Sequence, residues 1–150
     1  MPSALQAAEL GEGVVRPDLL RTIFSGDETM HFAVSWTGGI RIGDLDLELK
    51  PDGKGGRAIH ARVTDFGAFR MFYPVDDLFV TYVGGGRMLT YRYEVLQREG
   101  WQGQETRRLT SYDQAGRKVK YRKNDEAAEV LPVAGPVYNE FSSFYITRVM

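Results

Sequence analysis

Between residues 28 and 123 the chain alternates short apolar runs with clusters of turn residues. In the run 89–95, leucine, tyrosine and valine alternate with threonine, arginine and glutamate, a period of two that is typical of a strand with one buried face. About eight such runs are found, at residues 31–36, 40–49, 59–64, 66–73, 78–83, 89–95, 106–112 and 118–122. Their close spacing, with turn residues between most neighbours, predicts an antiparallel meander.

The run 40–49 changes phase in its middle. Ile40 and Ile42 carry even numbers, whereas the three leucines that follow carry odd ones. Because successive side chains of a strand point to opposite faces, this slip implies a β-bulge at Gly43-Asp44, and we predict a bent strand. The run 78–83 is apolar at both parities, which predicts a strand covered on both faces.

The two ends of the chain depart from this pattern. Residues 1–27 are heterogeneous and are expected to form a weakly ordered arm in which Pro17 opens a short helix. Near the other end, apolar residues recur at spacings of three and four and predict one helix: Tyr138, Phe141, Phe144, Tyr145 and Val149. Asn139 or Ser142 is its expected cap. We predict a mostly β domain over residues 28–150, a curved meander forming a partly open, lipocalin-like or half-barrel with the C-terminal helix packed on it.

Composition narrows the classes of function. A chain of 150 residues, 43% hydrophobic and 26% charged, suits one globular domain. Its 19 basic and 20 acidic side chains leave a net charge of −1, so neither nucleic acid nor an anionic membrane is expected as a partner. The absence of cysteine excludes thiol nucleophiles, thiolate zinc sites and disulfides. No stretch reaches the ~18 apolar residues of a membrane-spanning helix. We predict no cofactor.

Candidate catalytic or metal-binding residues form no compact motif. His31 and His60 stand on different predicted strands and are expected to be polar strand residues rather than ligands. Asp44, Asp46 and Glu48 share one face of a strand. Such a row could bind a cation, although pairing with an arginine or lysine on a neighbouring strand explains it more simply.

Two further charged groups have a functional and a plain structural interpretation. Asp76 and Asp77 are adjacent in a strand and should point to opposite faces, which excludes a shared-proton pair; Asp76 remains a candidate acceptor at the mouth of a cavity. Lys118, Lys120 and Arg122 line one face of their strand. They could bind phosphate or a lipid headgroup, or could simply face solvent.

Aromatic side chains make up 12% of the chain and are its most informative feature. Most are expected in the core. An eight-stranded barrel has an interior large enough either to be packed solid or to hold one small ligand. We therefore expect some aromatic residues to line an apolar cavity between sheet and helix, with Phe69, Phe72, Tyr82 and Phe144 as the candidates.

Three separated motifs resemble a known bacterial family. They are the segments 32–43 (FAVSWTGGIRIG), 72–77 (FYPVDD) and 139–148 (NEFSSFYITR), which occur in the order that the Domain of Unknown Function 3108 family shows. The likeness runs from about Glu28 to the end of the chain. Members are typically exported β proteins of the cell envelope without established activity. The resemblance therefore implies a periplasmic or envelope location and a β fold, but no site residue.

The two ends of the chain lead to predictions about location and about oligomeric state. The first residues lack the basic and apolar regions of a secretory signal, so the chain is expected to be either cytosolic or the mature form of an exported protein. Members of the family usually continue past residues 145–148 with further strands. A truncated sheet would leave an unpaired edge, which predicts a homodimer through β-strand pairing or exchange.

Three functions stay open on the sequence alone. The first is a non-enzymatic envelope protein that binds an apolar or amphipathic ligand, or an envelope partner, between sheet and helix. The second is a structural or interaction module that acts through a sheet edge and has no ligand cavity. The third is a hydrolase that uses carboxylates such as Asp76 and Glu94, although no motif places two carboxyls in opposition.

Overall fold

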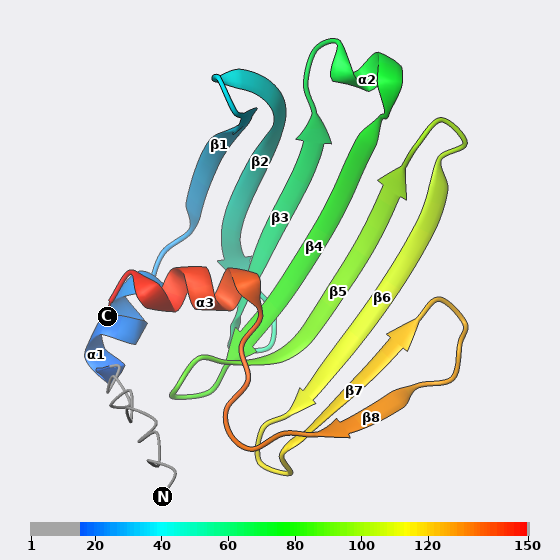
Figure 1. Cartoon of the computed structure of the whole chain (residues 1–150). Coiled ribbons are helices and arrows are strands. Elements are labelled where there is room, and N and C mark those ends of the chain that lie inside the picture. The colour runs from blue at the N-terminus through cyan, green and yellow to red at the C-terminus, as the bar shows by residue number, and fades with distance from the viewer. Residues whose placement is uncertain (1–15, 150) are drawn as a thin grey trace, which may run out of the picture.

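The computed structural model describes residues 16–149. The strands of this part are β1 (Glu28–Trp36), β2 (Ile40–Pro51), β3 (Arg57–Asp65), β4 (Val75–Gly84), β5 (Leu89–Glu99), β6 (Gln104–Asp113), β7 (Lys118–Lys123) and β8 (Glu129–Pro132). Its helices are α1 (Pro17–Ile23), α2 (Phe69–Phe72) and α3 (Glu140–Thr147). All eight strands form one antiparallel sheet in which each strand pairs with the next along the chain (Figure 1). The meander predicted from the alternating pattern is confirmed.

The sheet is open. Its end strands are β1 and β8, which pair with β2 and β7 respectively and, within residues 16–149, not with each other. Figure 1 shows a sheet that is not strongly curled. A barrel closes only when strand tilt and register bring the first strand beside the last, and β8 is a four-residue strand far across the sheet from β1. The predicted partly open barrel is therefore wrong, whereas the C-terminal helix over a meander is correct.

The bent strand predicted at Gly43-Asp44 is confirmed to within one residue. Val34 lies opposite Gly43, but the next residue of β1 lies opposite Arg41, so Ile42 is the extra residue of the bulge. Glycine is needed at position 43 because a Cβ atom there would lie 2.6 Å from a backbone carbonyl oxygen of β3.

One run with a strand-like composition is not a strand. Residues 66–73 form the connection between β3 and β4, which contains α2. Gly67, two residues after the end of β3, adopts a φ of 59°, and Pro74 precedes β4, so the ladder does not continue through this segment. The eighth strand is β8, a short segment that the alternation did not identify.

Helix α3 starts at a capping box. The Asn139 side chain accepts a hydrogen bond from the Ser142 backbone N–H at 2.9 Å, and the Ser142 Oγ accepts one from the Asn139 N–H at 3.0 Å. Each side chain satisfies a backbone donor that the first turn of the helix leaves free. The two residues proposed from the sequence as alternative caps thus act together.

Helix α3 lies against β3 and β4 (Figure 1). We call the side of the sheet that meets α3 the covered face and the opposite side the bare face; on β4, residues 77, 79, 81 and 83 belong to the former and residues 76, 78, 80 and 82 to the latter. The core under α3 consists of Leu20, Phe24, Leu49, Ile59, Val83, Tyr145 and Ile146. Leu20 and Phe24 come from α1 and the residue after it. This part of the expected N-terminal arm is packed, and residues 1–15 lie outside the described part.

Four buried polar side chains join α3 to the sheet, and we call them the polar seam: Thr81, Thr90, Asn139 and Ser142. The Asn139 amide donates to the Thr81 hydroxyl at 2.7 Å, and the Thr90 hydroxyl donates to the Ser142 hydroxyl at 2.9 Å. Because buried polar groups are costly without partners, these bonds fix the position of α3 along the strands. Over residues 16–149, no helix combines the length and apolar character needed to cross a bilayer.

Candidate functional site

The bare face contains an open hollow of about 800 Å³ that spans β4 to β7. Its floor is aliphatic and consists of Leu78, Val80, Leu96 and Leu109. Leu78 lies directly opposite Leu96, and paired residues of antiparallel strands point to the same side of the sheet. The volume falls within the roughly 300–1,000 Å³ that small-molecule sites occupy.

Charged side chains surround this floor, and most of them are paired. The Arg92 Nε lies 2.5 Å from a Glu94 oxygen, and the Arg107 Nε donates to Glu105 at 2.6 Å. Arg107 and Arg98 together lower the pKa of the Glu105 carboxyl, which keeps this group ionised.

Arg122 and Arg108 differ from Arg92 and Arg107, because neither has an ion-pair partner within residues 16–149. Of the two, Arg122 is the one that extends from the bare face, whereas Arg108 lies opposite Val95, which belongs to the covered face. Arg122 lines the hollow from β7, directly opposite Leu109 on β6. The basic face proposed from the sequence at residues 118–122 therefore supplies Arg122, an unpaired cation on the bare face beside the apolar floor.

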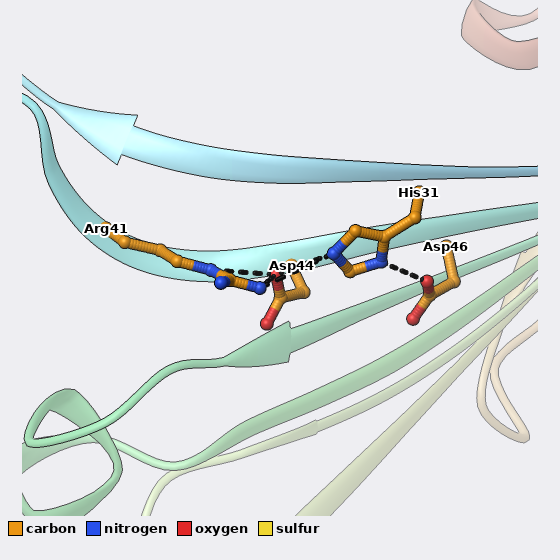
Figure 2. Close-up of polar contacts among 4 residues, drawn as sticks. All are labelled: His31, Arg41, Asp44 and Asp46. Atoms are coloured by element: carbon orange, nitrogen blue, oxygen red, sulfur yellow. Dashed lines mark hydrogen bonds and ion pairs between the residues drawn. The ribbon is translucent and has the colours of Figure 1, made fainter.

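A second polar cluster lies on the bare face at the edge of the sheet (Figure 2). The imidazole of His31 on β1 stands between two carboxylates of β2, with Nδ1 2.6 Å from Asp46 and Nε2 3.3 Å from Asp44. Arg41 donates to Asp44 through Nε at 3.0 Å. The cross-strand partner of Asp44 and Asp46 is thus a histidine and not the predicted arginine or lysine, and Glu48 pairs with Lys50 of its own strand.

This cluster has the character of an ion-pair network that ties the edge strand to β2. No group of three or more histidine, aspartate or glutamate residues in the described part of the chain has a metal-site arrangement. The second histidine, His60, stands apart on β3, where burial and then Lys50 lower its pKa.

The four residues proposed from the sequence as ligand contacts lie in three different places. Phe69 and Phe72 are exposed on α2, at the end of the sheet away from α3. Tyr82 belongs to the bare face, with its ring 5.9 Å from that of Tyr91. Phe144 lies on α3 and meets Phe32 edge-on at 6.1 Å. They do not line a common cavity.

Asp76 and Asp77, which are adjacent on β4, point to opposite faces of the sheet, as predicted for neighbouring residues of a strand. Asp76 on the bare face accepts two hydrogen bonds from Arg62, at 2.9 and 3.0 Å, and this pairing lowers the pKa of Asp76. It lines a smaller open hollow of about 340 Å³ on the bare face. Asp77 is buried on the covered face, and burial raises its pKa, with Glu99 adding to the effect.

The floor of the large hollow was not identified from the sequence, although one signal was present. The run 78–83 is apolar at both parities, which predicted cover on both faces. Phe79 meets α3 through Phe141 at a ring distance of 5.5 Å. On the other face, Leu78 remains 37% exposed and forms part of the open floor. An apolar residue on the second face can therefore indicate a hollow as well as a buried layer.

Comparison with known proteins identifies the family of the chain. Neither the curated proteins nor the solved structures contain a match. A match to the family described as "Protein of unknown function (DUF3108)" covers residues 31–149, which is most of the chain. The protein therefore belongs to the DUF3108 family.

Proposed function

We propose that the protein binds an amphipathic molecule with an anionic head on the bare face of the sheet and does not act as an enzyme. The observation that carries this proposal is the position of Arg122, an unpaired guanidinium beside an aliphatic floor. An apolar tail would cover Leu78, Leu96 and Leu109, at about 0.8 kcal/mol for each buried CH₂ group. The anionic head would supply the carboxylate-like partner that Arg122 lacks.

The bare face is a better location for this ligand than the space between sheet and helix. Beneath α3, the ring of Phe141 packs against Phe79 at 5.5 Å and Tyr93 at 6.5 Å, which fills the space. The hollows of about 800, 560 and 340 Å³ have no lining residue from α3.

A binding role is also preferred over the carboxylate-dependent hydrolase. Glu94 is paired with Arg92, and Asp76 is held at both oxygens by Arg62. Hydrolysis by two carboxyls needs one of them to hold a proton while the other is ionised. Pairing with Arg62 lowers the pKa of Asp76 and favours its ionised form, so Asp76 is a poor proton donor.

The test is a titration with a fluorescent fatty-acid analogue, dansylaminoundecanoic acid, and with its uncharged methyl ester. We expect the acid to bind more tightly than the ester. The Arg122→Ala variant should weaken binding of the acid by roughly tenfold, the loss of one charge-assisted hydrogen bond, and leave the ester unaffected. Arg87→Ala, which removes an exposed arginine from the β4–β5 turn, is the matched control. Equal affinity for acid and ester, or no binding of either, would contradict the proposal.

A second candidate function rests on the open edges of the sheet. Val130 and Leu131 of the end strand β8 are 57% and 54% exposed, and the outer backbone of this strand is free to pair within the described structure. A homodimer would form if two copies paired there. Light scattering at tens of micromolar should then give the mass of a dimer, and Leu131→Lys should return it to that of a monomer. A monomeric mass for the unmodified protein would eliminate this candidate.

We also propose that the protein works in the periplasm or elsewhere in the cell envelope. Two observations support this location. The chain belongs to the DUF3108 family, and the sequence motifs that it shares with this family resemble those of exported envelope proteins. Fractionation of cells that express the natural gene would test this location. Recovery of the protein entirely with the cytosolic fraction would contradict it.

A further inference from the structure

One end of the sheet exposes an unusual number of large apolar side chains, which we call the aromatic platform. They come from the β3–β4 and β5–β6 connections and from the two strand ends that flank the β1–β2 turn, all at the top of Figure 1. The members are between 41% and 74% exposed: Trp36, Ile40, Phe66, Phe69, Met71, Phe72, Tyr73 and Trp101. Single exposed apolar residues are ordinary, but eight at one end of a sheet indicate an interaction surface.

The platform is held in place by contacts between its connections. The Trp101 indole donates to the backbone carbonyl of Phe72 at 3.0 Å, and the Gly100 N–H donates to the carbonyl of Pro74 at 2.9 Å. The guanidinium of Arg41 lies 4.0 Å from the centre of the Phe66 ring. These contacts fix the backbone and leave the aromatic rings facing outward. The exposed rings are therefore a fixed feature of the fold and not the ends of loose loops.

The arginines next to the platform are already paired inside the chain, and the Glu99 carboxylate accepts a hydrogen bond from the hydroxyl of the platform residue Tyr73 at 3.2 Å. Arg41 pairs with Asp44, and Arg70 donates to Asp65 at 2.8 Å. No unpaired cation among these groups is left to attract an anionic surface. A partner without net charge is compatible with this arrangement.

The shape of the platform also discriminates between partners. None of its eight members lines the three hollows of about 800, 560 and 340 Å³. Protruding rings fit a deformable partner that needs no matching pockets. Tryptophan and tyrosine are the side chains that concentrate at membrane–water interfaces, where an apolar ring and a polar atom are both accommodated.

We propose that the aromatic platform docks the protein on the surface of a bilayer of zwitterionic lipid, with its rings inserted among the headgroups. The bilayer is contacted and not crossed. This inference is independent of the ligand proposed for the bare face, because the two surfaces share no residue.

The chain carries its own probe for this contact. It contains two tryptophans, Trp36 and Trp101, and both belong to the platform. On addition of phosphatidylcholine vesicles we expect the tryptophan emission to shift to shorter wavelength and the protein to sediment with the vesicles. Lipids brominated on the acyl chain should quench the emission. Because no charge attraction is involved, high salt should not release the protein.

Variants separate the platform from the rest of the surface. Met71→Ser combined with Phe72→Ser leaves both tryptophans in place and should weaken vesicle partitioning at least tenfold. The matched control, Val130→Ser with Leu131→Ser, removes exposed apolar residues from β8 and should bind vesicles like the unmodified protein. Circular dichroism establishes that each variant is folded. Arg122→Ala should also keep vesicle binding, which separates this test from that of the hollow.

Three results would overturn the inference. The first is an emission that does not change with vesicles. The second is a shift to shorter wavelength that appears without lipid as protein concentration rises, which would identify a second copy of the chain as the occupant. The third is equal loss of vesicle binding in the platform variant and in the β8 control.

Discussion

Under helix α3 the ring of Tyr145 is fully buried and stacks on Phe24 at 5.7 Å, whereas at the far end of the sheet Phe72 keeps 74% of its surface exposed. Both are aromatic residues of short helices that contact the same sheet. The difference is the second layer: α1 and α3 cover one end, and no described element covers the other. Aromatic content alone therefore does not distinguish a core from an exposed surface in this fold. Substitutions at the covered end should therefore change the free energy of unfolding, whereas substitutions at the exposed end should leave it nearly unchanged.

The largest effect is expected at Tyr145. Replacing a fully buried ring with alanine leaves a cavity, and Tyr145→Ala should lower the free energy of unfolding by about 3–5 kcal/mol. Within residues 16–149 the buried hydroxyl has no hydrogen-bond partner, and burial raises its pKa to about 12. Tyr145→Phe keeps the ring and removes this hydroxyl, so it should be neutral or stabilising by up to about 1–3 kcal/mol. Urea denaturation measures both, and a strong destabilisation by phenylalanine would show that the hydroxyl has a partner in solution.

The polar seam should give the next largest effect. Asn139→Ala removes the cap of α3 and leaves the buried Thr81 hydroxyl without its amide donor. We expect a loss of roughly 2–3 kcal/mol from the two contributions together. Thr147→Ala, which changes an exposed hydroxyl at the other end of α3, is the control and should cost less than about 0.5 kcal/mol. Equal losses in urea denaturation would mean that the seam does not hold the helix on the sheet.

Two buried carboxylates near the platform should respond to pH in opposite directions. Burial opposes ionisation of Asp65, but hydrogen bonds from Arg70 and the Val75 N–H outweigh it and lower the pKa of Asp65. Its stabilising contribution is therefore present above the unfolded pKa of about 3.9 and is lost as the pH falls through the lower folded pKa. Burial, and then Glu99, raises the pKa of Asp77, so its contribution is present below about 3.9 and is lost as the pH rises through the folded pKa.

The asparagine variants test these signs. Relative to the unmodified protein, Asp65→Asn should be less stable at neutral pH, with a deficit that shrinks in acid. Asp77→Asn should gain relative stability as the pH is raised from about 4, because an uncharged amide is not penalised by burial. The measurement is the free energy of unfolding in urea between about pH 3 and pH 7, the range that brackets both windows. Parallel pH profiles for the two variants would contradict the opposite pKa shifts of Asp65 and Asp77.

The sequence pattern predicted local structure well because each local signal has one dominant cause. The alternation in the run 89–95 arises because one face of the strand is buried. The change of phase at Gly43 reveals a bulge because successive side chains of a strand point to opposite faces. The cap residues Asn139 and Ser142 satisfy donors within a single helical turn. Each of these features depends on residues that are close in the sequence, so a pattern contains the necessary information.

The closure of the sheet and the grouping of side chains were not predictable in the same way. Whether β1 meets β8 depends on tilt accumulated over the whole sheet, which no local pattern records. The four expected ligand contacts share only their aromatic character: Tyr82 extends from the bare face, whereas Phe144 packs against Phe32 over the covered face. The hollow on the bare face brings Leu78, Leu96 and Leu109 together from three strands. Only the register shows that they are neighbours.

The smallest change in stability is expected at the platform. Met71 and Phe72 are 72% and 74% exposed, so most of their apolar surface is already in water in the folded state. Met71→Ser with Phe72→Ser should therefore change the free energy of unfolding by no more than about 0.5 kcal/mol per site, far less than Tyr145→Ala. Urea denaturation followed by circular dichroism measures this directly. A loss comparable to that of Tyr145→Ala would mean that the two side chains are buried in solution, by a second copy or by another part of the chain, and would remove the distinction between the covered and exposed ends of the sheet.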